Sequence, residues 1–185
     1  MVKSDYKKAF TYADYLSWDD GKRWELHEGV PYLMVPAPSP EHQEISVNIT
    51  RQLSNYLMGK SCKVYAAPFD VRLNPEEGDD IVCQPDIVLV CDLSKIDRRG
   101  CVGAPDMVVE ILSPSTSRQD RLLKFKYYLN AGVREYWIVD PEQKTVQVCL
   151  LEDGKYIMYM HDDTAQISVH VLDSCVIDMT EVFPR

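Results

Sequence analysis

An α-helix over 41–58 is the clearest element that the alternation of apolar and polar residues predicts in this 185-residue chain. Apolar residues recur there at every fourth position, which places them on one helix face, and Gly59 follows as a stop signal. A second helix is predicted over 117–130, with Ser117 as its N-cap and Gly132 just past its end. The apolar stripe of the first helix consists of Ile45, Ile49, Leu53 and Leu57.

Nearly continuous apolar runs, rich in β-branched residues, predict strands that are covered on both faces. They lie at 86–91, 107–112 and 135–139, and a β-prone stretch at 63–73 precedes them. The order of elements is typical of an α/β or α+β fold with a mixed central sheet flanked by helices. A peripheral layer of C-terminal antiparallel strands is expected at 144–151, 156–160 and 167–171.

The first 36 residues predict a helix and a hairpin that precede the main body. The helix is expected over 11–17, with Thr11 as its N-cap and Asp14 completing a capping box. The hairpin is expected at 23–27 and 30–35. A proline-rich joint at 36–40 then leads to a core over 40–185, so the chain is predicted to be one domain over 1–185 with an N-terminal extension.

Composition narrows the class of protein. Hydrophobic residues make up 45% of the chain, enough for a core, and no apolar run approaches the ~18–20 residues that span a bilayer. The N-terminus lacks the apolar stretch of a signal peptide, so a cytoplasmic location without membrane contact is expected. Six cysteines without a Cys-x-x-Cys pair favour reduced, buried thiols over a zinc site. A net charge of −9 argues against a protein that coats nucleic acid, but only mildly against one that cuts it.

Two acidic residues stand out because they lie in apolar strands, where an unpaired carboxylate is costly. Asp86 opens one predicted strand and Glu110 interrupts another. If the strands are neighbours, the two carboxylates converge, and a divalent cation such as Mg²⁺ would relieve their repulsion. From the residues alone two alternatives stay open: separate pairing of each acid with Arg or Lys, and a strand-capping role for Asp86.

An ordered string of residues surrounds these acids and extends over about residues 8 to 183. Its N-terminal members are Trp24-Glu25-Leu26, Gly29, His42 and Gln84-Pro85-Asp86. Its C-terminal members are Val109-Glu110-Ile111-Leu112-Ser113-Pro114-Ser115-Thr116, Asp120, Lys124, Tyr128, Gly132-Val133 and Glu135-Tyr136-Trp137-Ile138-Val139-Asp140-Pro141.

Pro85-Asp86 followed by Glu110 resembles the PD-(D/E)XK nuclease signature, and the longer string is similar to the Uma-two family of restriction endonucleases. The resemblance implies a restriction-endonuclease-like core and hydrolysis of phosphodiester bonds in DNA. It also implies that Mg²⁺ or Mn²⁺ is held by Asp86, Glu110 and the backbone carbonyl of Ile111. A homodimer is a candidate assembly, because cutting both strands of a duplex needs two sites.

The catalytic lysine departs from the superfamily pattern. Leu112 stands where a lysine is expected, two residues after Glu110. The resemblance implies that the lysine has moved to the following helix, where Lys124 matches it and shares a face with Asp120. A surface ion pair of Asp120 with Lys124 is the alternative. On helical spacing alone Lys126 is an equal candidate, since it projects toward the more apolar face.

Substrate contacts are expected from four further residues: His42 and Gln84 of the same string, and Arg118 and Arg121 of a compact basic cluster. Helix packing or capping is the alternative for His42, and a solvated helix face is the alternative for the arginines. Two other functions remain open. One is a decayed nuclease fold that binds or regulates, which Leu112 favours; the other is a metal-dependent phosphohydrolase for small nucleotides, which the acidic charge favours.

Overall fold

The computed structural model describes residues 9–34, 38–113 and 118–184, although the side chains of 118–120 lie outside this description. Within these ranges the helices are α1 (Tyr12–Tyr15), α2 (Pro40–Leu57) and α3 (Arg118–Ala131), with 3₁₀ turns at Leu93–Lys95 and Met179–Glu181. None of these described helices is long and apolar enough to cross a membrane. The strands are β1 (Trp24–His27), β2 (Val30–Leu33), β3 (Lys63–Ala66), β4 (Asp70–Arg72), β5 (Val82–Cys83), β6 (Ile87–Val90), β7 (Gly100–Val102), β8 (Met107–Ile111), β9 (Glu135–Asp140), β10 (Thr145–Glu152), β11 (Lys155–Asp162), β12 (Gln166–Ser168) and β13 (Val176–Asp178).

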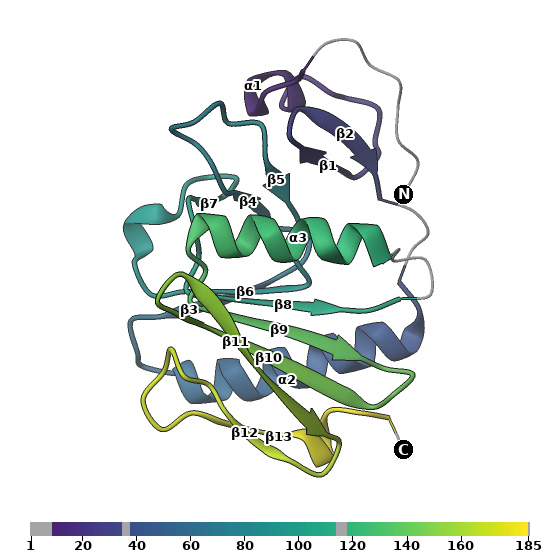
Figure 1. The fold of residues 1–185 in the computed structure, drawn as a ribbon, viewed down its shortest axis with the longest axis vertical. Coiled ribbons are helices and arrows are strands. Elements are labelled where there is room, and N and C mark those ends of the chain that lie inside the picture. The colour runs from purple at the N-terminus through teal and green to yellow at the C-terminus, as the bar shows by residue number, and fades with distance from the viewer. Residues whose placement is uncertain (1–8, 35–37, 114–117, 185) are drawn as a thin grey trace.

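The larger sheet is mixed, with the strand order β11-β10-β9-β8-β6-β3. β8 and β9 run parallel, and the other neighbours run antiparallel. Figure 1 shows α2 and α3 on opposite sides of this sheet. The mixed sheet flanked by helices confirms the fold class that the sequence predicted.

The face of the sheet beneath α2 forms the first core. Ser39 caps this helix by accepting a hydrogen bond from the backbone N–H of His42, and Pro40 fits its first turn. The predicted apolar stripe of α2 is buried, with Ile45, Ile49 and Leu53 all at 0% exposure. It packs on the odd-numbered residues of the neighbouring strands, among them Ile87, Leu89, Val109 and Ile111.

The opposite face of the sheet forms a second core together with α3 and a smaller sheet. Even-numbered residues of the same strands, such as Val88 and Val108, belong to one hydrophobic cluster with Tyr128 of α3. The smaller sheet has the order β2-β1-β5-β4-β7. Its residues Val71 and Cys83 lie in this second core. Residue 110 is also even-numbered, so the strand alternation directs the Glu110 side chain toward α3.

The N-terminal hairpin is part of the smaller sheet. The capping box of Thr11 and Asp14 is present as predicted, and so is the turn between β1 and β2. Leu26 of β1 pairs with Val82 of β5, which ties the hairpin to the strand that leads toward Asp86. Figure 1 shows the hairpin on the α3 side of the molecule.

Several strands differ from the prediction. The stretch at 63–73 is divided by a cis Ala67–Pro68 bond into β3 and β4, which belong to different sheets. β10 and β11 extend the main sheet instead of forming a separate layer, because β10 pairs along its length with β9. β7 and β13, each of three residues, are too short to show a periodic pattern.

Two of the six cysteines differ from the prediction of reduced thiols. Cys62 and Cys91 form a disulfide. They lie opposite each other, one residue beyond the Lys63–Val90 pair of β3 and β6. The prediction was wrong because strand register decides which cysteines are neighbours, and their spacing along the chain does not reveal it. The other four are free and buried, as predicted: Cys83, Cys101, Cys149 and Cys175.

Candidate active site

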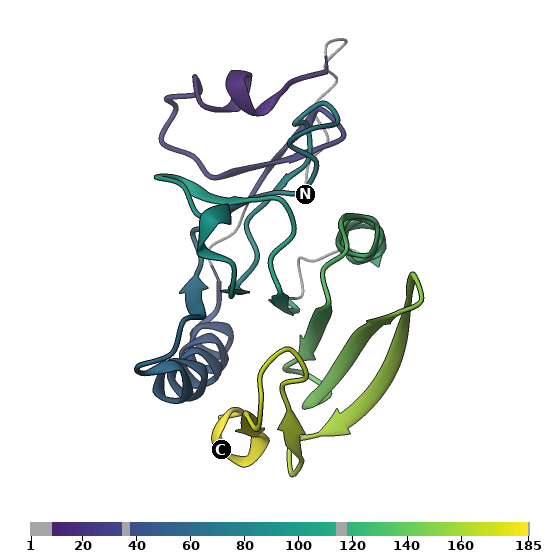
Figure 2. The same cartoon turned by 90° about the vertical axis from the view of Figure 1, so that its left-hand side faces the viewer.

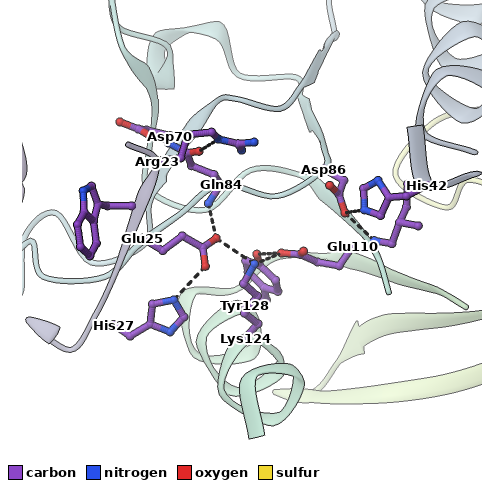
Figure 3. Close-up of polar contacts among 12 residues, drawn as sticks. Arg23, Glu25, His27, His42, Asp70, Gln84, Asp86, Glu110, Lys124 and Tyr128 are labelled. Carbon is purple, nitrogen blue, oxygen red and sulfur yellow. Dashed lines mark hydrogen bonds and ion pairs between the residues drawn. The ribbon is translucent and has the colours of Figure 1, made fainter. Parts of the chain in front are cut away.

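The strand register places the two predicted acids opposite each other. β6 and β8 are antiparallel neighbours with Ile87 paired to Val109, so one residue further along Asp86 faces Glu110. Directly opposed residues in such a pair have Cβ atoms about 4.5–5.5 Å apart. The condition that the acid-bearing strands are neighbours is therefore met, and Figure 3 shows both side chains in one region.

Asp86 is held in place by two donors on a single oxygen. Its Oδ2 accepts from the backbone N–H of Ile111 at 2.8 Å and lies 3.3 Å from Nε2 of His42. Burial opposes protonation of His42, but the hydrogen bond to Asp86 and the charge of Asp86 raise its pKa above the usual value. His42, predicted as a substrate contact, thus lies beside the first acid, and Asp86 favours its protonated form.

Glu110 is held from α3. Its Oε1 accepts from Nζ of Lys124 at 2.9 Å and from the hydroxyl of Tyr128 at 2.6 Å. Burial raises the pKa of Glu110 to about 7; Lys124 opposes the rise, and the charges of Asp86 and Glu25 add to it. A cation bound beside Glu110 would oppose this rise, because it stabilises the charged form of the carboxyl group.

Lys124 occupies the centre of the cluster. Its side chain is 10% exposed, and its Nζ lies 2.9 Å from Oε1 of Glu110 and 2.9 Å from Oε1 of Glu25. Burial alone would lower the pKa of Lys124, but the two carboxylates raise it well above its usual range, so the amine stays charged. Lys126 is exposed. The apolar face that favoured it is only partly buried, since Leu122 is 62% exposed.

Glu25, on β1, is the site residue that the sequence reasoning missed. It is 1% exposed, and its Oε1 accepts from the backbone N–H of Gln84 at 2.8 Å in addition to Lys124. Its Oε2 lies 3.1 Å from Nε2 of His27. Burial would raise the pKa of Glu25, but Lys124 and His27 lower it well below the usual range. The sequence feature that could have identified Glu25 is the presence of a charged residue within the predicted strand.

Gln84 links the cluster to the N-terminal segment. Its side-chain Nε2 donates to Oδ1 of Asp70 at 2.9 Å and to the hydroxyl of Tyr15 at 3.1 Å, and its Oε1 accepts from Nε of Arg23 at 3.0 Å. Gln84 is 8% exposed. The residue predicted to contact substrate is thus engaged within the protein, and it positions the backbone N–H that reaches Glu25.

The remaining predicted residues belong to the basic cluster of α3 and to the usual lysine position. Arg121 is exposed on α3, and the side chains of Arg118 and Asp120 lie outside the described residues. Leu112, at the usual lysine position, is half-buried and packs against the α3-side core. The ammonium group beside Glu110 therefore comes from the helix and not from the strand.

The two acids fit a hard divalent cation. All the donors that reach them from the described residues go to Oδ2 of Asp86 and Oε1 of Glu110, which leaves Oδ1 and Oε2 available as oxygen ligands. Mg²⁺ and Mn²⁺ prefer such carboxylate oxygens and retain several waters. The arrangement of donors therefore fits the metal that the family resemblance implies.

A second group of potential ligand atoms lies nearby but fits a cation less well. Glu25, His27 and Cys83 place one ligand atom each within 4.8 Å of one another. Both oxygens of Glu25 already carry donors, and one of these is the ammonium of Lys124. This group is therefore better described as an ion-paired core than as a metal centre.

A groove of about 310 Å³ has Asp86 among its lining residues. Its wall is the outer face of α2 from Gln43 to Ser54, and Ala66 and Ala67 form the opposite side. Thr50 has a buried hydroxyl there with no partner among the described residues. The groove gives solvent and an extended ligand a path to the first acid.

We expect Glu25→Gln to destabilise the protein by about 3 kcal/mol, the low end for breaking a buried ion pair, because Glu110 still accompanies Lys124. The free energy of unfolding in urea measures the effect. Glu44→Gln, an exposed glutamate of α2, is the matched control and should change stability by less than about 0.5 kcal/mol. Equal stability of both variants would show that Glu25 does not support Lys124.

The fold is shared with a solved structure. The crystal structure described as "a putative nuclease belonging to DUF820", from Anabaena variabilis, matches with a TM-score of 0.76. The match covers 94% of this chain and 97% of that chain at 18% sequence identity, so it shows the fold. The chain has a restriction-endonuclease-like nuclease fold, as the sequence predicted.

The family follows from sequence. The Uma2 family, described as "Putative restriction endonuclease", matches residues 12–180. An uncharacterized protein of Synechocystis sp. is 32% identical over 152 residues, which are 78% of this chain and 76% of that protein. The chain belongs to the Uma2 family, which confirms the predicted resemblance and supports a nuclease.

Proposed function

We propose that this protein is a divalent-metal-dependent nuclease that hydrolyses phosphodiester bonds in DNA. The observation that carries the proposal is the opposition of Asp86 and Glu110 on neighbouring strands, with the buried ammonium of Lys124 at 2.9 Å from Glu110. Two converging acids and one lysine are the residue types that phosphodiester hydrolysis with a bound metal requires.

Each residue has a role that its contacts support. Asp86 and Glu110 would hold Mg²⁺ or Mn²⁺ through Oδ1 and Oε2, with the carbonyl of Ile111 as a third ligand. The ion, when bound, supplies positive charge that polarises the phosphate and activates water. Lys124 donates hydrogen bonds and stabilises negative charge as it develops on the phosphate oxygens. Glu25 positions Lys124 and keeps it protonated.

The path of the substrate is the groove along α2. Asp86 lines it, and its wall offers hydroxyl groups and the side chain of Arg51. His42 lies where this helix begins and faces Asp86, so it would contact the scissile phosphate or its water. Cutting both strands of a duplex requires two such sites, and for this reason a homodimer belongs to the proposal.

Nicking of supercoiled plasmid by purified protein tests the proposal. We expect relaxed and then linear DNA in Mg²⁺ or Mn²⁺, and no cleavage after chelation, because the acids need a cation between them. Calorimetry with Mn²⁺ on the protein alone reports the metal site separately. Metal binding without cleavage of DNA, but with hydrolysis of free nucleotides, would replace the nuclease by a phosphohydrolase. Absence of both binding and cleavage would indicate a decayed site.

A further inference from the structure

The outer strand of the larger sheet, β11, has an open edge. Among residues 9–34, 38–113 and 118–184, its strand partner is β10, and its other side faces outward. Figure 2 shows β11 at the margin of the molecule, away from the N-terminal sheet. β11 runs for eight residues, so a long row of backbone donors and acceptors is left without a strand partner.

The side chains of β11 are apolar where they are most exposed. This stretch is Ile157 at 40%, Met158 at 54%, Tyr159 at 46% and Met160 at 65% exposure. The other three edges of the two sheets are shorter: β2 and β3 have four residues each and β7 has three. β2 also contains Pro31, which cannot donate to a further strand. β11 is the edge that lacks these protections.

The ends of β11 carry opposite charges. Lys155 begins the strand opposite Glu152 of β10, and Asp162 and Asp163 lie at and just beyond its end. When two copies of such a strand pair antiparallel, Lys155 of each lies beside the acidic end of the other. Parallel pairing would bring like charges together. The strand is therefore complementary to itself about a two-fold axis.

We propose that β11 is the interface of a homodimer, in which the sheets of two copies join edge to edge across a two-fold axis. The axis is perpendicular to the sheet, so residues that meet across it share a face. Tyr159 then lies at the axis beside the partner's Tyr159. Met158 faces the partner's Met160, and Lys155 faces the partner's Asp163.

A second copy fits this edge better than an unrelated peptide. A peptide strand could use the backbone edge, but it would need both an acidic and a basic end at the spacing that β11 itself provides. Burial of the four apolar side chains supplies the driving force, and the end charges set the direction of pairing. The proposal does not depend on nuclease activity, although a dimer would bring together the two sites that duplex cleavage requires.

The mass of the native protein in solution tests the interface. Light scattering between about 1 and 100 µM should show twice the 21.3 kDa chain mass at the upper end, since an interface built on one strand is small. Tyr159→Lys should raise the dissociation constant by at least about tenfold, because it places two like charges at the axis. Met58→Lys, at a site 75% exposed beyond α2, should leave it unchanged.

Two further sets of variants, a charge exchange and a pair of cysteine substitutions, test the predicted pairing of residues across the axis. Lys155→Asp should weaken the dimer, and adding Asp163→Lys to it should restore the dimer. Tyr159→Cys should form a disulfide-linked dimer on mild oxidation, whereas Met58→Cys should not. A wild-type monomer at about 100 µM, or a dimer that Tyr159→Lys leaves intact, would overturn the proposal. Circular dichroism confirms that each variant is folded.

Discussion

Glu110→Gln is expected to reduce metal-dependent DNA cleavage by about 1,000-fold or more. Glutamine keeps the side-chain length and an oxygen that Lys124 and Tyr128 can donate to, but it removes the negative charge opposite Asp86. Stabilisation of charge by a bound metal is worth several kcal/mol, and about 1.4 kcal/mol corresponds to a factor of ten in rate. The initial rate of plasmid nicking measures the loss of cleavage, and the Mn²⁺ affinity measures the loss of metal binding.

Glu135→Gln is the matched control. Glu135 is likewise a strand glutamate and is fully buried, with oxygens that accept from Nε1 of Trp137 at 2.7 Å and from the backbone N–H of Val171 at 2.9 Å. Its loss should lower stability but leave the activity of the folded protein within about twofold, since it lies outside the cluster. Unchanged cleavage by Glu110→Gln would exclude Glu110 as a metal ligand.

Lys124→Met should have the second large effect, on activity and on stability together. Methionine fills similar volume, but it leaves Glu25 and Glu110 buried without the cation they share. We expect cleavage to fall by about 100- to 1,000-fold, as when one preorganised donor to a transition state is removed. We also expect a loss of about 3–5 kcal/mol in the free energy of unfolding. Mn²⁺ binding should remain, which separates this variant from Glu110→Gln.

The stability of Lys124→Met should depend on pH in a defined direction. Burial already raises the pKa of Glu110, and Lys124 is the charge that opposes the rise, so its removal raises that pKa further. The folded variant then binds protons more tightly than the unfolded chain, and its stability falls as pH rises. Urea midpoints at about pH 5.5 and pH 8 should therefore differ more than in the wild type.

Lys126→Met controls for the loss of a lysine from α3. Lys126 is exposed, so this variant should keep full cleavage and change stability by less than about 0.5 kcal/mol. If Lys126→Met lost activity and Lys124→Met retained it, the relocated lysine would be the other candidate of the same helix.

Periodicity alone was sufficient to predict the main elements of the fold. The stripe of α2, the apolar runs of β6, β8 and β9, and the capping box of α1 depend on neighbours in sequence, where local chemistry dominates. Asp86 and Glu110 could be found because a charge inside an apolar strand needs a reason. Their opposition could not be predicted, because it depends on the register between β6 and β8.

Other features of the site depended on contacts that sequence spacing does not reveal. Lys124 and Lys126 were equivalent by spacing, because a helical wheel counts Leu122 as buried although it is exposed. Glu25 shows the same signal as Glu110, a charge within a strand, but the hairpin that carries it was interpreted as an extension. The pairing of β1 with β5 brings that hairpin against α3 and completes the cluster.

The salt bridge between Glu25 and Lys124 also determines the electrical balance of the site. Counted by themselves, the carboxylates of Glu25, Asp86 and Glu110 and the ammonium of Lys124 carry a formal charge of −2. One divalent ion neutralises it, whereas a monovalent ion leaves it negative. Glu25 lies on the N-terminal hairpin and is not one of the two proposed metal ligands. Its negative charge nevertheless makes the charge of the site equal and opposite to that of a divalent ion.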